Sequence, residues 1–329
     1  SETFIVDATL IITGDDEGPL LPTELGGSAL TWDGSAETNG SFQIKGSTLN
    51  DTIITGSGED TIIAGYGDDT IATNAGADTI IMDKNLTSSD TINGGDGLDE
   101  VQFTDSNAAT NDLDGVSNVE TITLGNTATS VTTKDSLVAN GQTLAVNSAG
   151  LTGSNFLTWD GSAETDGRFE IIGSDQADSI IAGAGNDAVT SGAGDDYIVT
   201  GLGSDLIDFG INLSEADIVD GGDGIDELTF KDSGFDTSEL DRVRNVEIIS
   251  FQDRNANVTT VDALIASGAT LTVDGTALSG GNSLTWDGSA ELDGSFDITG
   301  SDQDDVITGG AGADTVAAGA GSDTIMGGA

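Results

Sequence analysis

The sequence predicts an all-β protein, an elongated repeat protein in which parallel β-roll or β-solenoid blocks alternate with β-rich spacer coils. Three observations support this fold class. A nine-residue repeat rich in Gly and Asp recurs in three blocks, a unit of 127 residues repeats around it, and carboxylates greatly outnumber basic side chains.

The charge of the chain requires compensation. It has 58 Asp and Glu against 8 Lys and Arg, which gives a formal net charge of −50. A compact fold with that charge repels itself unless cations are bound within it. Hydrophobic residues make up 36% of the chain and recur periodically, which favours order over disorder. Nucleic acid is excluded as a partner class, because phosphate binding needs clustered Lys and Arg.

The composition also restricts the metal chemistry. The chain contains no Cys and no His, so disulfides, zinc or iron sites and thiol nucleophiles are excluded. Oxygen ligands remain, and these suit hard cations, Ca²⁺ above all. No run of 18 apolar residues occurs, so we predict no transmembrane segment.

The long repeat is marked by the segment Leu-Thr-Trp-Asp-Gly-Ser-Ala-Glu, whose tryptophans are Trp32, Trp159 and Trp286. Two interpretations of these side chains are open: they fill the core where a spacer meets a block, or they stack on sugar rings. The carboxylates beside them, such as Asp160 and Glu164, either hold a further Ca²⁺ or are solvated. The chain begins like the end of one unit and ends within a block, so we expect a segment of a longer array.

The short repeat places one Asp at its sixth position and an apolar residue at its eighth, as in the run GSTLNDTII, TGSGEDTII, AGYGDDTIA that starts at Gly46. Strand side chains alternate, so Ile62 and Ile198 are expected to face a core while Thr61 and Tyr197 face out. Glycines such as Gly65 and Gly67 permit positive φ and let carbonyls turn towards an ion.

This pattern is kept best in Gly309–Ala317 and Gly94–Gln102, and it resembles the RTX, or haemolysin-type, calcium-binding repeat. The resemblance implies a parallel β-roll with two nonapeptides per coil and multiple Ca²⁺ held between loops one coil apart. The implied metal ligands are Asp51, Asp60, Asp69, Asp78, Asp99, Asp178, Asp187, Asp196, Asp205, Asp226, Asp305, Asp314 and Asp323.

Two departures from the pattern affect these sites. Asp90 and Asp217 follow a three-residue insertion, so whether they stack with the others is left open. Leu49 and Gln176 stand where glycine is expected, which suggests weaker sites at the first loop of a block.

The repeats divide the chain into six expected segments. These are the end of a preceding unit with a tryptophan loop (1–45), β-roll I (46–102), spacer I (103–172), β-roll II (173–229), spacer II (230–299) and the start of β-roll III (300–329). The spacers are interpreted as further solenoid coils or as a small β-domain.

No feature of the sequence predicts catalysis. His is absent for a triad, no Gly-x-Ser-x-Gly turn occurs, and no pair of carboxylates stands apart from the repeat register. We therefore expect no catalytic residues and no enzymatic activity.

The apolar content of a nonapeptide is small against the entropy of ordering nine residues. Our hypothesis is therefore that the rolls are disordered without Ca²⁺ and ordered with it. The resemblance implies a secreted bacterial protein, exported by type I secretion, with a structural or adhesive role at the cell surface, as in S-layers, fibres or large adhesins. The alternatives are a non-catalytic secretion and folding domain of an exoenzyme or toxin, and a carbohydrate-binding adhesin. Expected partners beyond Ca²⁺ are further copies of the chain or cell-surface polysaccharide.

Overall fold

The computed structural model describes residues 10–13, 28–105, 109–231 and 238–328. Within these ranges the fold is all-β, as predicted, and the helical elements are two short 3-10 turns, η1 (Asp112–Gly115) and η2 (Asp262–Leu264). No helix in the described part of the chain is long and apolar enough to cross a membrane. The chain divides into two compact units, Ser1–Glu170 and Ile171–Ala329.

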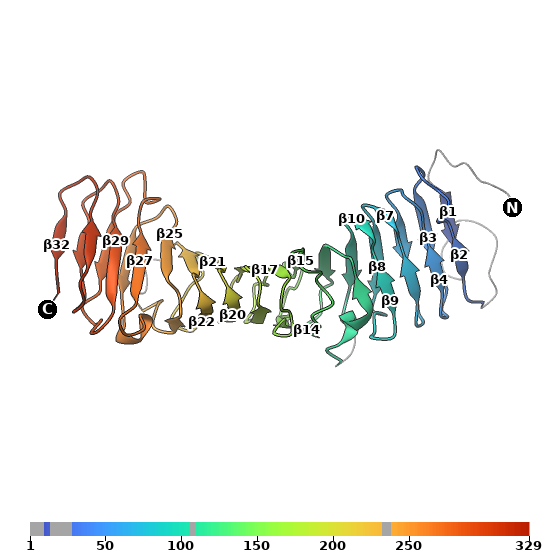
Figure 1. Ribbon diagram of the computed structural model, residues 1–329, viewed down its shortest axis with the longest axis horizontal. Coiled ribbons are helices and arrows are strands. Elements are labelled where there is room, and N and C mark those ends of the chain that lie inside the picture. Colours follow the sequence, from blue (N-terminus) through green and yellow to red (C-terminus); the bar gives the residue numbers. More distant parts are fainter. Residues whose placement is uncertain (1–9, 14–27, 106–108, 232–237, 329) are drawn as a thin grey trace. The chain divides into compact units, whose positions relative to one another are not determined.

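The first unit consists of parallel strands connected by tight loops (Figure 1). Its strands are β1 (Leu10–Thr13), β2 (Thr31–Asp33), β3 (Phe42–Lys45), β4 (Thr52–Ile54), β5 (Thr61–Ile63), β6 (Thr70–Ala72), β7 (Ala75–Gly76), β8 (Thr79–Asp83), β9 (Thr91–Asn93), β10 (Asp96–Gly97), β11 (Glu100–Phe103), β12 (Val116–Ser117), β13 (Thr121–Leu124), β14 (Thr129–Thr132), β15 (Thr143–Asn147) and β16 (Leu157–Asp160). The order β1-β3-β5-β8-β11-β13-β15 forms one face and β12-β9-β6-β4-β2 the other, so alternate strands lie on opposite faces.

The second unit repeats this arrangement, with the orders β19-β21-β23-β25-β27-β29-β31, β18-β20-β22-β24 and β26-β28-β30-β32. Its strands are β18 (Ser179–Gly183), β19 (Ala188–Thr190), β20 (Tyr197–Gly203), β21 (Leu206–Gly210), β22 (Ile218–Gly224), β23 (Glu227–Phe230), β24 (Val243–Arg244), β25 (Ile248–Phe251), β26 (Ala256–Thr259), β27 (Thr270–Asp274), β28 (Leu284–Asp287), β29 (Ser295–Thr299), β30 (Val306–Thr308), β31 (Thr315–Ala317) and β32 (Thr324–Met326). Strand β17 (Arg168–Ile172) spans the boundary between the units.

The strand register confirms that two nonapeptides make one coil. Thr52 pairs with Thr70, and Thr61 pairs with Thr79. Aspartates in the same relation lie 18 residues apart. After the three-residue insertion Thr70 pairs with Thr91, and the separation becomes 21. The insertion is therefore accommodated in a loop, and the stacking of the coils continues past it.

The core contains the position-eight side chain of most nonapeptides and, in many of them, also the side chain at position one. The apolar residue at position eight is buried, as expected; examples are Ile53, Ile62, Ile71 and Ile80. The residue two places later, at position one of the next nonapeptide, is also fully buried; examples are Thr55, Ala64, Thr73, Ala182 and Thr200. The hydroxyl of Thr55 donates to the carbonyl of Thr73 one coil away, at 3.0 Å. This second inward position did not emerge from the sequence, and it makes the core wider than one apolar side chain per repeat.

The spacer in the first unit continues the solenoid. Strand β13 pairs in parallel with β11 and β15, and β14 pairs with β16. These coils are longer, since Thr129 pairs with Leu157. Of the two interpretations left open, solenoid coils and a small separate β-domain, the structure has the first.

Two of the three tryptophans of the long repeat, Trp159 and Trp286, belong to the core, whereas Trp32 is only partly buried. Trp159 is 1% exposed and Trp286 is 0% exposed. Each makes an edge-to-face contact with a phenylalanine ten residues later, Trp159 with Phe169 and Trp286 with Phe296, both at 5.5 Å between ring centroids. The interpretation of these two side chains as core residues is confirmed.

Replacing Trp159 with alanine should destabilise the calcium-saturated protein by about 3–5 kcal/mol, because the substitution leaves a large cavity in a packed core. The measurement is the unfolding midpoint in denaturant at saturating Ca²⁺. Tyr66→Ala serves as the control, because Tyr66 is 63% exposed and its loss should change stability by no more than about 0.5 kcal/mol. Equal effects of the two substitutions would contradict the core role of Trp159.

Candidate calcium sites

The repeat aspartates connect successive coils through their carboxylates. Asp69 accepts a hydrogen bond from the backbone N–H of Asp51 at 2.8 Å, and Asp90 accepts one from the N–H of Asp69 at 2.7 Å. On the other edge of the roll, Asp78 accepts from the N–H of Asp60 at 2.7 Å. Within a block, a carboxylate thus accepts the N–H of the aspartate one coil earlier, and the aspartates form a ladder along each edge.

The same ladders recur in the other blocks. Asp99 accepts from Asp78, Asp196 from Asp178, Asp217 from Asp196, Asp205 from Asp187, Asp226 from Asp205 and Asp323 from Asp305, at 2.7 to 3.0 Å. Asp314 caps the N–H of Phe296 in the tryptophan loop at 2.9 Å. Asp90 and Asp217 are members of the ladders, so their stacking, which the sequence left open, is established.

Each long ladder ends on a glutamate in the spacer. Glu120 accepts the N–H of Asp99 at 2.8 Å, and Glu247 accepts the N–H of Asp226 at 2.9 Å. These residues were not predicted. The signal was present in the sequence, since the separation from Asp99 to Glu120 is 21 residues, the same as that from Asp69 to Asp90.

The aspartates fall into two groups, according to whether the second carboxylate oxygen has a hydrogen-bond partner within the protein. In the first group Oδ2 is buried and has no hydrogen-bond partner, although each residue is no more than 2% exposed; these are Asp60, Asp69, Asp78, Asp99, Asp196, Asp205 and Asp226. An oxygen buried without a partner is costly when it carries charge. These seven positions therefore offer an oxygen that the protein itself leaves available to a cation.

In the second group the protein supplies the partner. The first aspartate of each block, Asp51, Asp178 or Asp305, accepts the N–H and the hydroxyl of a serine four residues earlier, Ser47, Ser174 or Ser301. After the insertion, Oδ2 of Asp90 and of Asp217 accepts from Thr87 and Ser214. Asp187 and Asp314 accept from the backbone N–H of Gly183 and Gly310. At the first loop of a block, where the sequence predicts weaker sites, both carboxylate oxygens therefore already have partners within the protein.

Burial changes the acidity of the ladder aspartates. Desolvation raises the pKa of Asp69, Asp78 and Asp196 to about 7, and the neighbouring ladder carboxylates add to the shift. The pKa values of Asp205 and Asp226 rise to about 6 for the same reasons. Burial also raises the pKa of Asp60, Asp99 and Asp217; for Asp60 the nearby Thr55 hydroxyl offsets part of the rise. Without a bound cation, burial therefore opposes the ionisation of the ladder aspartates.

The loops that carry these carboxylates bring backbone carbonyls of the neighbouring coil close to their glycines. Gly65 and Gly67 have φ of 100° and 130°, as the sequence analysis expected. A Cβ at either position would collide with the backbone of Ser47 or Leu49 in the preceding coil. The stacked loops thus present carbonyl oxygens beside buried carboxylates, an all-oxygen donor set of the kind that Ca²⁺ prefers. Bound there, Ca²⁺ would supply the positive charge that the buried carboxylates lack.

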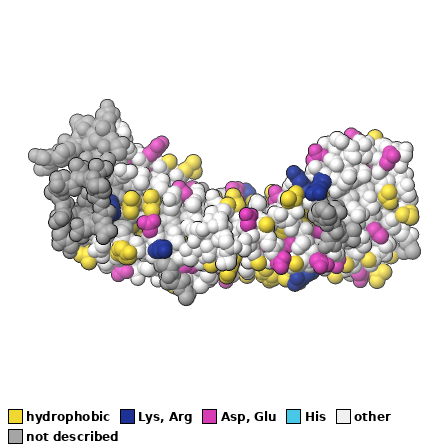
Figure 2. Space-filling view, turned by 180° about the vertical axis from the view of Figure 1, so that it is seen from behind, with side chains coloured by type: hydrophobic (Ala, Val, Ile, Leu, Met, Phe, Trp, Pro, Cys, Tyr) yellow, Lys and Arg dark blue, Asp and Glu magenta, His cyan; other side chains and the backbone are white. Residues whose placement is uncertain are grey.

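Acidic side chains do not gather into one patch on the described part of the face shown in Figure 2. On the face shown in Figure 2, Asp and Glu side chains are scattered among uncharged surface, with few Lys or Arg beside them. The buried ladder carboxylates, rather than a surface patch, are therefore the place where charge is concentrated in a regular pattern.

Replacing Asp69 with asparagine keeps an acceptor for the N–H of Asp51 and removes the charge. We expect the Ca²⁺ concentration at the midpoint of folding to rise roughly tenfold, since a contact to a charged group is worth about 1.5 kcal/mol or more. Asp68→Asn is the matched control, because Asp68 is the exposed neighbour and should leave the midpoint nearly unchanged. The measurement is a calcium titration followed by circular dichroism; equal midpoints for the two variants would exclude Asp69 as a ligand.

In calcium-free buffer the folded state should lose stability as the pH rises from about 4 to about 7. Between the ordinary Asp pKa of 3.8 and the raised value of about 7 for Asp69, Asp78 and Asp196, the folded state binds more protons than the unfolded state. The β-sheet signal in circular dichroism should therefore be stronger at pH 5 than at pH 8. Saturating Ca²⁺ should reverse the order, because the ion binds the deprotonated carboxylates.

The triple variant Asp69→Asn, Asp78→Asn, Asp196→Asn is the control for this pH dependence. Its calcium-free signal should change less between pH 5 and pH 8 than that of the unchanged protein. An unaltered pH dependence would mean that repulsion among the remaining carboxylates governs the effect.

Comparison with known proteins agrees with this geometry. A family model described as "RTX calcium-binding nonapeptide repeat (4 copies)" matches residues 45–80, 172–207 and 298–329. A search of curated proteins gives no match to the chain. The matched ranges contain the regular parts of the aspartate ladders, and the ladders extend beyond them to Asp99 and Asp226. The chain therefore carries three blocks of RTX calcium-binding nonapeptide repeats, and it is a calcium-binding repeat protein.

Proposed function

We propose that the chain is a calcium-dependent structural or adhesive module of a secreted bacterial surface protein, such as an S-layer, a fibre or a large adhesin. The observation that carries this proposal is the tandem arrangement. Blocks of buried carboxylate ladders alternate with spacers that continue the same parallel coils, and the whole pattern repeats after 127 residues. Such repetition builds length by adding equivalent coils.

The ladders provide the calcium dependence of this module. In the ion-free state, buried carboxylates of like charge stack one coil apart, about 4.8 Å along the sheet. Their Oδ1 atoms hold the N–H groups of the preceding coil, while Oδ2 at seven positions has no partner. A cation satisfies that oxygen and removes the repulsion, so ordering of the roll and binding of Ca²⁺ are coupled.

The secreted location is part of the proposal and rests on the family. RTX repeat proteins are typically secreted, and the lack of Cys and the large acidic excess fit a protein that relies on Ca²⁺ for its stability. We propose further copies of the chain, or polysaccharide of the cell surface, as partners. The carbohydrate-binding alternative gains nothing from Trp159 and Trp286, because their rings lie in the core.

The test is circular dichroism together with size exclusion and light scattering on one sample, first in chelator and then in millimolar Ca²⁺. We expect Ca²⁺ to increase the β-sheet signal and to reduce the hydrodynamic radius of the monomer. Formation of large regular assemblies in Ca²⁺ would favour a lattice or fibre, and a compact monomer would favour a spacer. A full β-sheet signal and an unchanged radius in chelator would contradict the proposal.

A further inference from the structure

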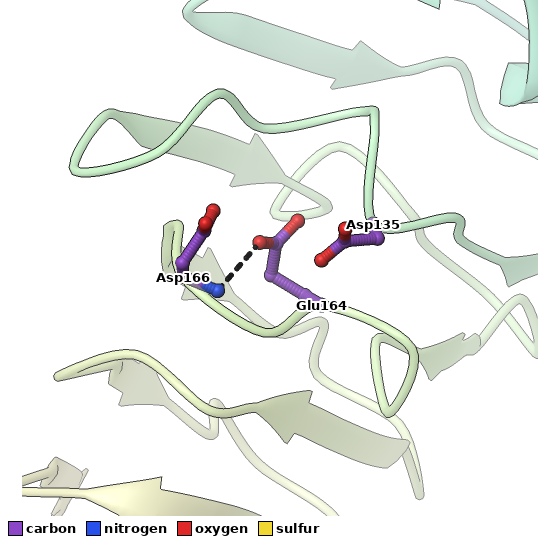
Figure 3. A group of neighbouring side chains, drawn as sticks. All are labelled: Asp135, Glu164 and Asp166. Carbon is purple, nitrogen blue, oxygen red and sulfur yellow. Dashed lines mark hydrogen bonds between the residues drawn. The ribbon is translucent and has the colours of Figure 1, made fainter.

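A second kind of acidic site lies outside the nonapeptides. Asp135, Glu164 and Asp166 each place a carboxylate oxygen within 4.8 Å of the others. Figure 3 shows Glu164 between the two aspartates, with Asp135 coming from a different loop. The arrangement recurs at the equivalent positions of the second unit, Asp262, Glu291 and Asp293. We refer to these groups as cluster 1 and cluster 2.

The central glutamate of cluster 1 is buried and only half satisfied. Glu164 is 1% exposed. Its Oε1 accepts the backbone N–H groups of Thr165, Asp166 and Gly167 at 3.1, 3.1 and 2.7 Å. Its Oε2 is buried and has no hydrogen-bond partner. The three N–H groups fix the carboxylate in place, and the second oxygen is left among the carboxylates of the cluster.

Cluster 2 repeats these details. Glu291 is 0% exposed; its Oε1 accepts the N–H groups of Asp293 and Gly294 at 3.1 and 2.7 Å, and its Oε2 has no partner. The outer aspartates also correspond, because Asp135 accepts the N–H of Thr165 and Asp262 accepts that of Leu292, both at 3.0 Å. Because the same arrangement occurs in both units, a chance placement of the side chains does not explain it.

No basic side chain compensates either cluster among the ion pairs of the described residues. Lys134 is next to Asp135 in sequence, but its Nζ pairs with Asp114 at 2.7 Å. Three carboxylates this close repel one another, and burial of the central one strengthens the repulsion. The three carboxylates therefore need a positive charge beside them, and no ion pair of the described residues provides one.

We propose that each cluster binds one Ca²⁺, at a site distinct from the nonapeptide loops. The donors are carboxylate oxygens, which are hard ligands. Calcium ligands lie at about 2.3–2.6 Å, so oxygens on opposite sides of one ion are about 5 Å apart, which matches a cluster whose oxygens lie within 4.8 Å of one another. The buried Oε2 of Glu164 or Glu291 is the central ligand, and the exposed aspartates leave positions for water.

The ion in cluster 1 would join two successive coils of the spacer. Asp135 follows β14, while Glu164 and Asp166 follow β16, and these two strands are paired neighbours. Calcium dependence would therefore extend into the spacers, where the nonapeptide repeat is absent.

The first test uses the full-length double variant Asp135→Asn, Asp262→Asn. Both side chains are exposed, and asparagine keeps the acceptor for the loop N–H, so the fold and the ladders should be retained. We expect about two fewer Ca²⁺ per chain than in the unchanged protein, measured by equilibrium dialysis and elemental analysis, and about one fewer for Asp135→Asn alone. The control is Asp160→Asn, Asp287→Asn, at the last residues of β16 and β28, close to the cluster loops in sequence but outside the clusters. An ion count equal to that of the unchanged protein, or the same loss in the control, overturns the proposal.

A second measurement requires no substitution. Crystals of the unchanged protein are soaked in Tb³⁺, and anomalous difference maps are calculated. A peak between Asp135, Glu164 and Asp166, and another in cluster 2, are expected. Peaks at the nonapeptide loops without peaks at the clusters would refute the cluster sites while leaving calcium binding by the repeats intact. The same soak with excess Mg²⁺ tests selectivity; loss of the cluster peaks alone would mean that the clusters are magnesium sites.

Discussion

The hydrogen bond from the N–H of a repeat aspartate to the carboxylate one coil later is the interaction on which the stacking of the coils in a block depends. It fixes the register of neighbouring coils, as at Asp51 and Asp69. It also places a charged group where water cannot reach its second oxygen. The stacking of the coils and the need for Ca²⁺ thus have the same origin, because the carboxylate that joins two coils is also the group that needs a cation.

Much of the fold was accessible from the sequence because the chemistry is periodic. The resemblance to the RTX repeat implied two nonapeptides per coil, and the alternation of strand side chains predicted that Ile62 and Ile198 are buried. Thr55 and Ala64 were missed because the family pattern places glycine at that position, although the period of two continues from Ile53 to Thr55. Glu120 was missed because the ladder there passes from aspartate to glutamate.

Other features depend on geometry that spacing does not contain. Oδ2 of Asp69 has no partner, whereas Ser47 satisfies both oxygens of Asp51; glycine, Gly65, stands at the position before Asp69 that corresponds to Ser47. The proximity of Asp135 to Glu164 depends on the length of a spacer coil, which does not follow the nine-residue repeat. The buried second oxygen and the acidic clusters therefore become apparent only in the three-dimensional structure.

The ladder has a direction. Every carboxylate reaches back to the coil that precedes it in the chain, so each coil is completed only when the next one is in place. Removing coils from the C-terminal side takes away the carboxylate that accepts an N–H, and removing them from the N-terminal side takes away the N–H that donates to a carboxylate. The two ends of a block therefore expose different groups to water, backbone N–H donors at the C-terminal side and carboxylate acceptors at the N-terminal side.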